Sequence, residues 1–290
     1  DFITAANYDQ NLELLRECDI VIEAIAERMD WKLDLFKKVA PFLGTNAIFA
    51  TNTSGLSINT LAEGCPESMR SRFCGIHFFN PPRYMHLVEI IPCATSEAVM
   101  LDQLEEFLVT TLGKGVVRAK DTPNFVANRI GVFSMLACIH NADKFGIRFD
   151  VVDDLTGPRL GRPKSATFRT ADVVGLDTFA HVVKTMQDTL PNDPWHPLFK
   201  SPEWLTKLIE AGALGQKTKA GIYKRDGKTK LVLDPKAGTY VETGVKGDDS
   251  VKEILKNKDV AAKLKALRES SHPQAQFLWA TFCDVFHYIA

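Results

Sequence analysis

The sequence lacks the features that would direct a protein to a membrane or to nucleic acid. No apolar run in the 290 residues approaches the roughly 20 that span a bilayer. Lys and Arg number 35 and Asp and Glu 36, mixed along the chain, so the net charge of -1 gives no electrostatic reason to expect such partners. We therefore expect a soluble, cytoplasmic protein that acts on a small molecule.

The six cysteines include no C-x-x-C pair, and four of them lie within apolar runs. Scattered thiols of this kind are typical of reduced, buried cysteines in a cytosolic protein. His77 and His86 are not spaced from each other or from the cysteines as metal ligands are. A disulfide framework and a metal site are therefore both disfavoured.

A glycine-rich phosphate turn is also missing, although short β-rich runs alternate with helical ones over residues 1–121. This alternation predicts an α/β fold with a doubly wound, Rossmann-like parallel sheet. Such a sheet normally opens with a strand, G-x-G-x-x-G and a helix. Because that opening is absent and the chain starts at Asp1 without Met, we expect an N-terminally truncated sheet in a fragment of a longer polypeptide.

Three parts are expected along the chain. Residues 1–121 would form the C-terminal part of a nucleotide-binding domain. Residues 122–225 have helical periodicity, beginning with the long segment 125–145, and predict an all-helical domain. Residues 226–290 begin with a polar stretch typical of a hairpin or linker, and continue into a charged helix near 251–267 and an apolar one. We interpret this last part as a linker and the start of a further helical region.

Four polar residues are candidates for chemistry. Ser54 and His77 follow or end predicted strands, Glu89 lies inside the apolar run L-V-E-I-I-P, and Asn128 lies at the start of the first long helix. In an open parallel sheet, ligands bind outside the carboxyl ends of the strands. A neutral imidazole suits proton removal from a secondary alcohol, and a carboxylate would orient it. Ser54 and Asn128 would hold the substrate oxygen.

Each of these residues also has a purely structural interpretation. Taken singly, Ser54 is a turn residue, Asn128 a helix cap and His77 a hydrogen-bonded residue of a packed strand. Glu89 is different, because an unpaired carboxylate in an apolar run is costly to bury and requires a partner. That position favours a functional site.

Several motifs in one order resemble the 3-hydroxyacyl-CoA dehydrogenase family over roughly residues 10 to 225. They are V-I-E-A-I-A-E (21–27), N-T-S (52–54), H-F-F-N-P (77–81), L-V-E-I-I (87–91), K-D-T-P-N-F-V-A-N-R (120–129), V-G-L-D-T (174–178) and Q-K-T-K-A-G-I-Y (216–223). The resemblance implies an NAD-binding first domain, a C-terminal domain like that of 6-phosphogluconate dehydrogenase, and NAD-dependent oxidation of (3S)-hydroxyacyl-CoA to 3-oxoacyl-CoA in fatty-acid β-oxidation.

The resemblance also implies roles for individual residues. His77 is the base and Glu89 its orienting carboxylate, while Ser54 and Asn128 contact the substrate. The residues implied in cofactor binding are Glu27, Lys32, Asn52, Ser54, Asn80 and, less securely, Lys217. The adenine-ribose acid and the phosphate-binding glycines have no counterpart in this sequence, so the motifs themselves do not separate NAD from NADP.

One motif departs from the family pattern, because P-K-S-A-T-F-R (163–169) stands where P-M-G-P-F-E is frequent. With the neighbouring motifs it resembles the long bacterial multifunctional type, which carries a fused enoyl-CoA hydratase module. We expect a homodimer or internal packing of a second helical repeat.

Two other classes stay open at this stage. Another β-hydroxyacid dehydrogenase of the same fold would use a lysine in the helical domain, where this chain has Asn128 and Arg129. A non-catalytic binding protein would not need Ser54, His77 and Glu89 together.

Overall fold

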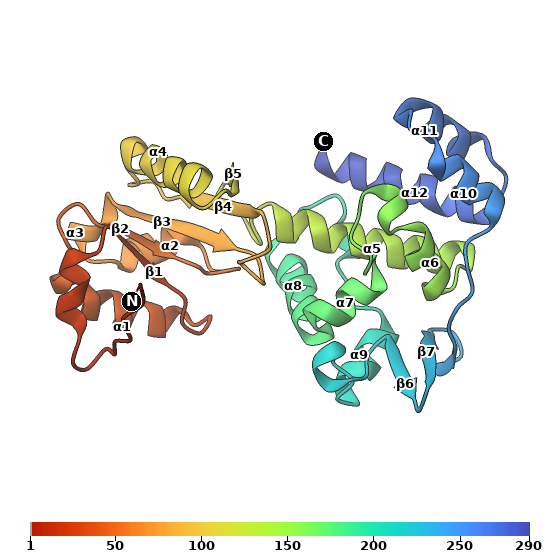
Figure 1. Ribbon diagram of the computed structural model, residues 1–290, viewed down its shortest axis with the longest axis horizontal. Helices are drawn as coiled ribbons and strands as arrows, with labels where there is room; N and C mark the ends of the chain where they lie inside the picture. Colours follow the sequence, from red (N-terminus) through yellow and green to blue (C-terminus); the bar gives the residue numbers. More distant parts are fainter. Residues whose placement is uncertain (1) are drawn as a thin grey trace. The chain divides into compact units, whose positions relative to one another are not determined.

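The computed structural model describes residues 2–290 and divides after Val126 into two compact units (Figure 1). Each unit has its own hydrophobic core. Within the described residues, no helix is both long enough and apolar enough to cross a membrane.

The first unit is built on a five-stranded sheet in the order β1-β2-β3-β4-β5 (Figure 1). Its strands are β1 (Ile20–Glu23), β2 (Ile48–Thr51), β3 (Phe73–Phe78), β4 (Leu87–Pro92) and β5 (Gly115–Arg118). Its helices are α1 (Met29–Val39), α2 (Ile58–Gly64), α3 (Glu67–Arg70) and α4 (Ala98–Glu106), and Phe107–Thr111 continue α4 as a π-helix. Ser57 caps α2 by accepting a hydrogen bond from the Thr60 amide.

The sheet is parallel from β1 to β3, but β4 runs antiparallel to β3, and β5 runs parallel to β4. The sequence predicts a parallel sheet throughout, so this strand direction is a correction. The reason is the connection: residues 79–86 are too few for a parallel crossover, which takes a dozen or more.

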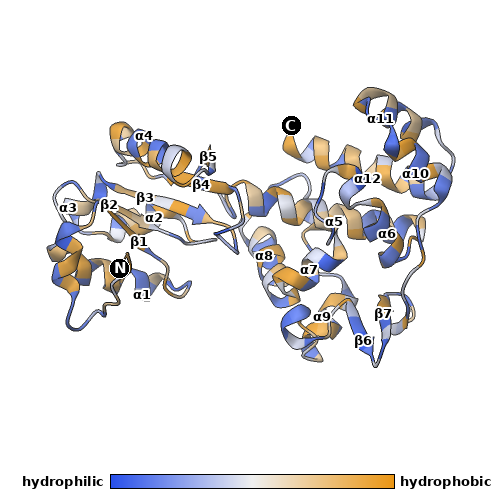
Figure 2. Cartoon of the chain, viewed as in Figure 1, coloured by the Kyte–Doolittle hydropathy of each residue, from blue (hydrophilic) through white to orange (hydrophobic). Residues whose placement is uncertain are grey.

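Side-chain alternation divides the sheet into two covered faces. On one face, Phe49 and Phe73 pack with Phe36 of α1 and Ile58 of α2. On the other face, residues of β2, β3 and β4 pack under α4 at Met100 and its neighbours. Figure 2 shows hydrophobic colour along the strands and on the helices that cover them. Because successive side chains alternate between faces, His77 and Glu89 share the face that carries Phe73 and α2.

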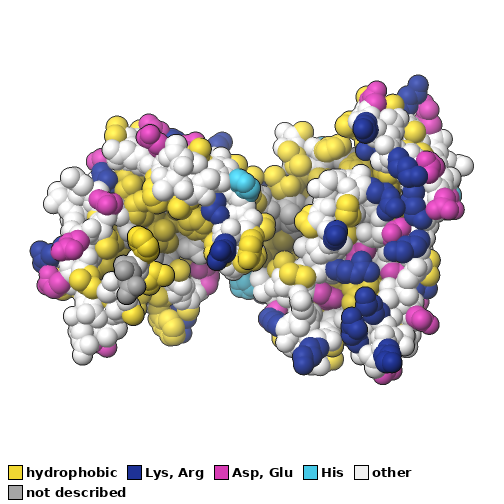
Figure 3. Space-filling model, in the orientation of Figure 1, with side chains coloured by type: hydrophobic (Ala, Val, Ile, Leu, Met, Phe, Trp, Pro, Cys, Tyr) yellow, Lys and Arg dark blue, Asp and Glu magenta, His cyan; other side chains and the backbone are white. Residues whose placement is uncertain are grey.

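The second unit is mainly helical. Its helices are α5 (Ala127–Phe145), α6 (Phe149–Leu155), α7 (Phe168–Val174), α8 (Leu176–Thr189), α9 (Glu203–Glu210), α10 (Asp249–Lys256), α11 (Val260–Glu269) and α12 (Pro273–Ile289). The last helix packs along α5: Phe133 stacks on Tyr288 with ring centroids 3.8 Å apart, and Asn141 donates to Asp284 at 2.7 Å. Figure 3 shows Lys and Arg gathered on one face of this unit, with Asp and Glu among them.

The stretch predicted as a hairpin or linker forms a three-stranded antiparallel sheet, β6 (Tyr223–Asp226), β7 (Thr229–Asp234) and β8 (Thr239–Glu242). Val232 and Leu233 of β7 enter the same core as the helices, so this segment is packed structure. The helix predicted near 251–267 is two helices, because Asp259 breaks it by capping α11.

The motif Q-K-T-K-A-G-I-Y anchors this sheet to the helices. The Asp172 carboxylate accepts hydrogen bonds from the Ile222 and Tyr223 amides, both at 2.8 Å. A Cβ on Gly221 would lie 2.1 Å from Asp172 Oδ1, so glycine is required for this close approach.

Candidate active site

The centre of the candidate site is a buried pair on adjacent strands. His77 Nδ1 lies 2.8 Å from Glu89 Oε2, and the two residues are 3% and 0% exposed. They face each other directly in the antiparallel register of β3 and β4. The contact that the sequence predicts between these residues is therefore present.

Aromatic rings and a backbone amide enclose this pair. The His77 ring lies 4.5 Å from the Phe79 ring and 5.6 Å from the Phe125 ring, measured between centroids. The second oxygen of Glu89, Oε1, accepts a hydrogen bond from the Val126 amide at 3.0 Å. The carboxylate is thus satisfied on both sides, which explains how it is tolerated inside an apolar strand.

The loop that carries Ser54 is held by Glu27. Glu27 Oε1 accepts from the Ser54 amide at 2.8 Å, from the Gly55 amide at 2.9 Å and from the Thr53 hydroxyl. Asn52 Oδ1 accepts from the Phe78 amide at 3.0 Å, which ties this loop to the end of β3. Ser54 itself is exposed. The N-T-S motif therefore sits beside the strand that presents His77.

Glu23 forms a buried ion pair with Lys32, and the sequence analysis did not single it out. Lys32 Nζ lies 2.7 and 2.9 Å from the two Glu23 oxygens, and both side chains are 1% exposed. Thr51 donates its hydroxyl to the same carboxylate at 2.6 Å. The Lys32 ammonium is 3.8 Å from Glu27 Oε2, so it links the Glu23 pair to the Ser54 loop. The signal was available: a glutamate within the apolar run D-I-V-I-E-A-I needs a buried partner.

The remaining predicted residues belong to other elements. Asn80 is exposed, beyond the end of β3. Asn128 is half-buried in the first turn of α5, in the second unit. Lys217, also in the second unit, binds both oxygens of Asp177 at 2.7 and 2.6 Å and thereby lowers the pKa of that carboxyl. Lys217 thus joins two of the quoted motifs.

The arrangement provides a base with an orienting carboxylate, which suits proton transfer. Residues 2–290 contain no cluster of three or more His, Cys, Asp or Glu side chains that could hold a metal ion.

Two family models match the chain in succession. Residues 1–122 match the NAD binding domain of 3-hydroxyacyl-CoA dehydrogenase, and residues 125–225 match its C-terminal domain. A solved structure of (S)-3-hydroxybutyryl-CoA dehydrogenase from Ralstonia eutropha is 30% identical with a TM-score of 0.64, and the match covers 75% of this chain and 74% of that one. The chain belongs to the 3-hydroxyacyl-CoA dehydrogenase family.

Curated relatives within the family are longer than this chain. A probable 3-hydroxyacyl-CoA dehydrogenase of Bacillus subtilis is 41% identical over 96% of this chain and 35% of its own length. A putative fatty acid oxidation complex trifunctional enzyme of Rickettsia felis is 37% identical over 77% of this chain and 31% of its own. The chain spans about a third of the length of these two relatives.

Proposed function

We propose that this chain contributes the catalytic pair of an NAD-dependent 3-hydroxyacyl-CoA dehydrogenase, which oxidises (3S)-hydroxyacyl-CoA to 3-oxoacyl-CoA in fatty-acid β-oxidation. The observation that carries the proposal is the buried contact of 2.8 Å between His77 and Glu89. Membership of the family supports it.

The direction of the His77–Glu89 hydrogen bond fixes the role of each nitrogen. An ionised carboxylate has no hydrogen to donate, so Nδ1–H of His77 donates to Glu89 and the lone pair of Nε2 is free to accept a proton. His77 takes the substrate hydroxyl proton while the hydrogen on the same carbon leaves as hydride. Glu89 stabilises the imidazolium that forms.

Ser54 and Asn128 are proposed to hydrogen-bond the substrate oxygen. Donors placed at this oxygen hold the alcohol against the base and polarise the carbonyl as it forms. The backbone amide of Ser54 is already fixed by Glu27, which leaves its hydroxyl available for this contact.

NAD, when bound, supplies the acceptor for the hydride. Glu27, with a side chain 38% exposed, together with exposed Ser54 and Asn80, offers carboxylate, hydroxyl and amide groups that fit ribose hydroxyls and a carboxamide. Asn52 supports this edge through its bond to the Phe78 amide. Lys32 is buried against Glu23, so we propose that it affects cofactor binding indirectly, by positioning Glu27. Lys217 has the least support as a cofactor contact, because its ammonium already forms an ion pair with Asp177.

Replacing the base tests this proposal. In the full-length protein, His77→Ala should lower kcat by about 10²- to 10⁴-fold and leave the affinity for NAD nearly unchanged. His86→Ala is the matched control, because His86 is exposed on the neighbouring connection. Unchanged kinetics in His77→Ala would remove this residue from its role. Turnover of a free β-hydroxyacid but not of 3-hydroxyacyl-CoA would instead identify another dehydrogenase of the same fold.

The wider setting is also proposed. The name of the Rickettsia relative supports a parent protein in which an enoyl-CoA hydratase module is fused to this part. We propose that the parent acts in the cytoplasm, as a homodimer or through internal packing of a second helical repeat.

A further inference from the structure

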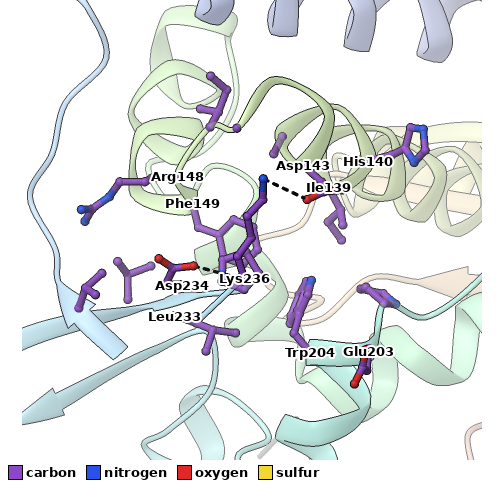
Figure 4. A pocket seen from close by; sticks show the side chains of 17 residues that line it. Ile139, His140, Asp143, Arg148, Phe149, Glu203, Trp204, Leu233, Asp234 and Lys236 are labelled. Carbon is purple, nitrogen blue, oxygen red and sulfur yellow. Dashed lines mark hydrogen bonds and ion pairs between the residues drawn. The ribbon is translucent and has the colours of Figure 1, made fainter. Parts of the chain in front are cut away.

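The second unit contains a cavity of about 490 Å³ whose lining includes none of the residues assigned above. The end of α5, the start of α6, the first turn of α9 and the β7–β8 region form its walls (Figure 4). Small-molecule sites typically measure about 300–1,000 Å³. The cavity is therefore large enough for a ligand in its own right.

The walls of this cavity are apolar and held in place. The rings of Trp204 and Phe149 meet with centroids 5.3 Å apart at 59°, and Phe149 stacks on Phe168 at 3.9 Å. Leu233 is only 5% exposed and Ile139 is half-buried. Aromatic and aliphatic walls of this kind favour a ligand with an aliphatic body.

Three charged residues of the rim already have close partners. Arg148 donates to the Asp150 carboxylate and to the Glu242 carbonyl. Glu203 forms an ion pair with Lys207, and Asp234 accepts hydrogen bonds from the amides of Lys236 and Ala237. In Figure 4 the Arg148 guanidinium also points away from Lys236. Recruiting any of these groups to a ligand would break close contacts.

Lys236 and Asp143 are bound more loosely. Their Nζ and Oδ1 atoms are 4.0 Å apart, and the side chains are 68% and 74% exposed. Figure 4 shows Lys236 reaching from the β7–β8 turn toward Asp143. Exposed ion pairs contribute little to stability, so a ligand can replace either partner at small cost. No side chain caps the first turn of α9, but Glu203 already places a negative charge there, so the Lys236 ammonium is the group that an anion would bind.

We propose that this cavity binds an anionic amphiphile, a carboxylate with an aliphatic tail. The tail lies against Trp204 and Phe149, and the carboxylate takes the place of Asp143 on the Lys236 ammonium. This site is separate from the proposed dehydrogenase chemistry, because its lining and the His77–Glu89 pair share no residue.

Calorimetric titration of the full-length protein with three eight-carbon probes tests the proposal. Octanoate should bind saturably and about fivefold or more tightly than octanol, while octyltrimethylammonium should bind least well. Lys236→Met should abolish the preference for octanoate over octanol. Asp143→Asn should tighten octanoate binding, since it removes the competing carboxylate.

Controls make the result specific to this cavity. Lys200→Met removes an exposed lysine that does not line it and should leave octanoate binding unchanged. Trp204→Ala, checked for wild-type circular dichroism, should weaken all three probes, and His77→Ala should weaken none. Absence of octanoate binding, equal affinity for octanol, preference for the ammonium probe, or an unaltered Lys236→Met would each overturn the proposal.

Discussion

The two units bury acidic side chains to similar depths but satisfy them in different ways. In the first unit, Glu23 and Glu89 are 4% and 0% exposed and face a lysine ammonium and an imidazole. In the second, Asp153 and Asp172 are 3% and 8% exposed and accept mainly from backbone amides at helix starts and turns, although Asp153 also accepts from the Tyr223 hydroxyl and lies 3.4 Å from the Arg169 guanidinium. A buried acid that faces a titratable side chain can take part in proton transfer. A buried acid that faces backbone amides fixes the conformation of the backbone.

The largest effect expected from this difference is on turnover. Glu89→Gln should lower kcat about 10²- to 10⁴-fold, because a glutamine amide donating to Nδ1 leaves the hydrogen on Nε2 and removes the base. Steady-state kinetics of the full-length variant measure this change, with NAD affinity as the control. A variant with kcat near that of the wild type would remove the distinction between the two kinds of buried acid.

The next effect concerns the ion pair under the Ser54 loop. Lys32→Met leaves the Glu23 carboxylate buried without its cation and should destabilise the first unit by about 3–5 kcal/mol. The double variant Glu23→Gln/Lys32→Met should recover part of that loss. Hydrogen exchange of the β1 and β2 amides measures both. Equal exchange in wild type and Lys32→Met would contradict the pairing.

A smaller, purely structural effect is expected at Asp153. Its carboxylate accepts from the amides of Thr167, Phe168 and Arg169 at the start of α7, at 3.0, 2.7 and 3.1 Å. Asp153→Ala leaves these donors unsatisfied and should destabilise the second unit by about 1–3 kcal/mol, measured by urea unfolding. The kcat per folded molecule should stay at its wild-type value, and a large loss would mean that this acid also serves the chemistry.

The last effect is a pH dependence of stability that comes from Asp172. Burial raises the pKa of this carboxyl from 3.8 to about 6, against the two amides that donate to it. At this carboxyl the folded chain therefore binds more protons than the unfolded chain between those values, so the contribution of Asp172 to stability is largest below pH 4 and is lost as pH rises through 6. We expect this contribution to fall by at most about 3 kcal/mol across this window in urea titrations. In Asp172→Asn the contribution of this residue to that slope should vanish.

The sequence predicted those parts of the structure that depend on local pattern and on the cost of burial. The strands, the long helix α5 at Ala127–Phe145 and the contact of Glu89 with His77 all follow from apolar periodicity and from a carboxylate that needs a partner. Strand direction did not follow, since strand residues look alike whichever way their neighbour runs. Glu23 was missed although the same signal was present, and its partner could not be read from periodicity, because Lys32 follows a turn that periodicity does not describe.

The register of β3 and β4 sets the spacing of His77 and Glu89 independently of the connection between the two strands. Because residues 77 and 89 are opposed across a hydrogen-bonded ladder, their spacing is set by the sheet, and the connection at 79–86 contributes little to it. The part of that connection beyond Asn80 can consequently change while the spacing of these two groups stays the same, whereas Phe79 packs against the His77 ring.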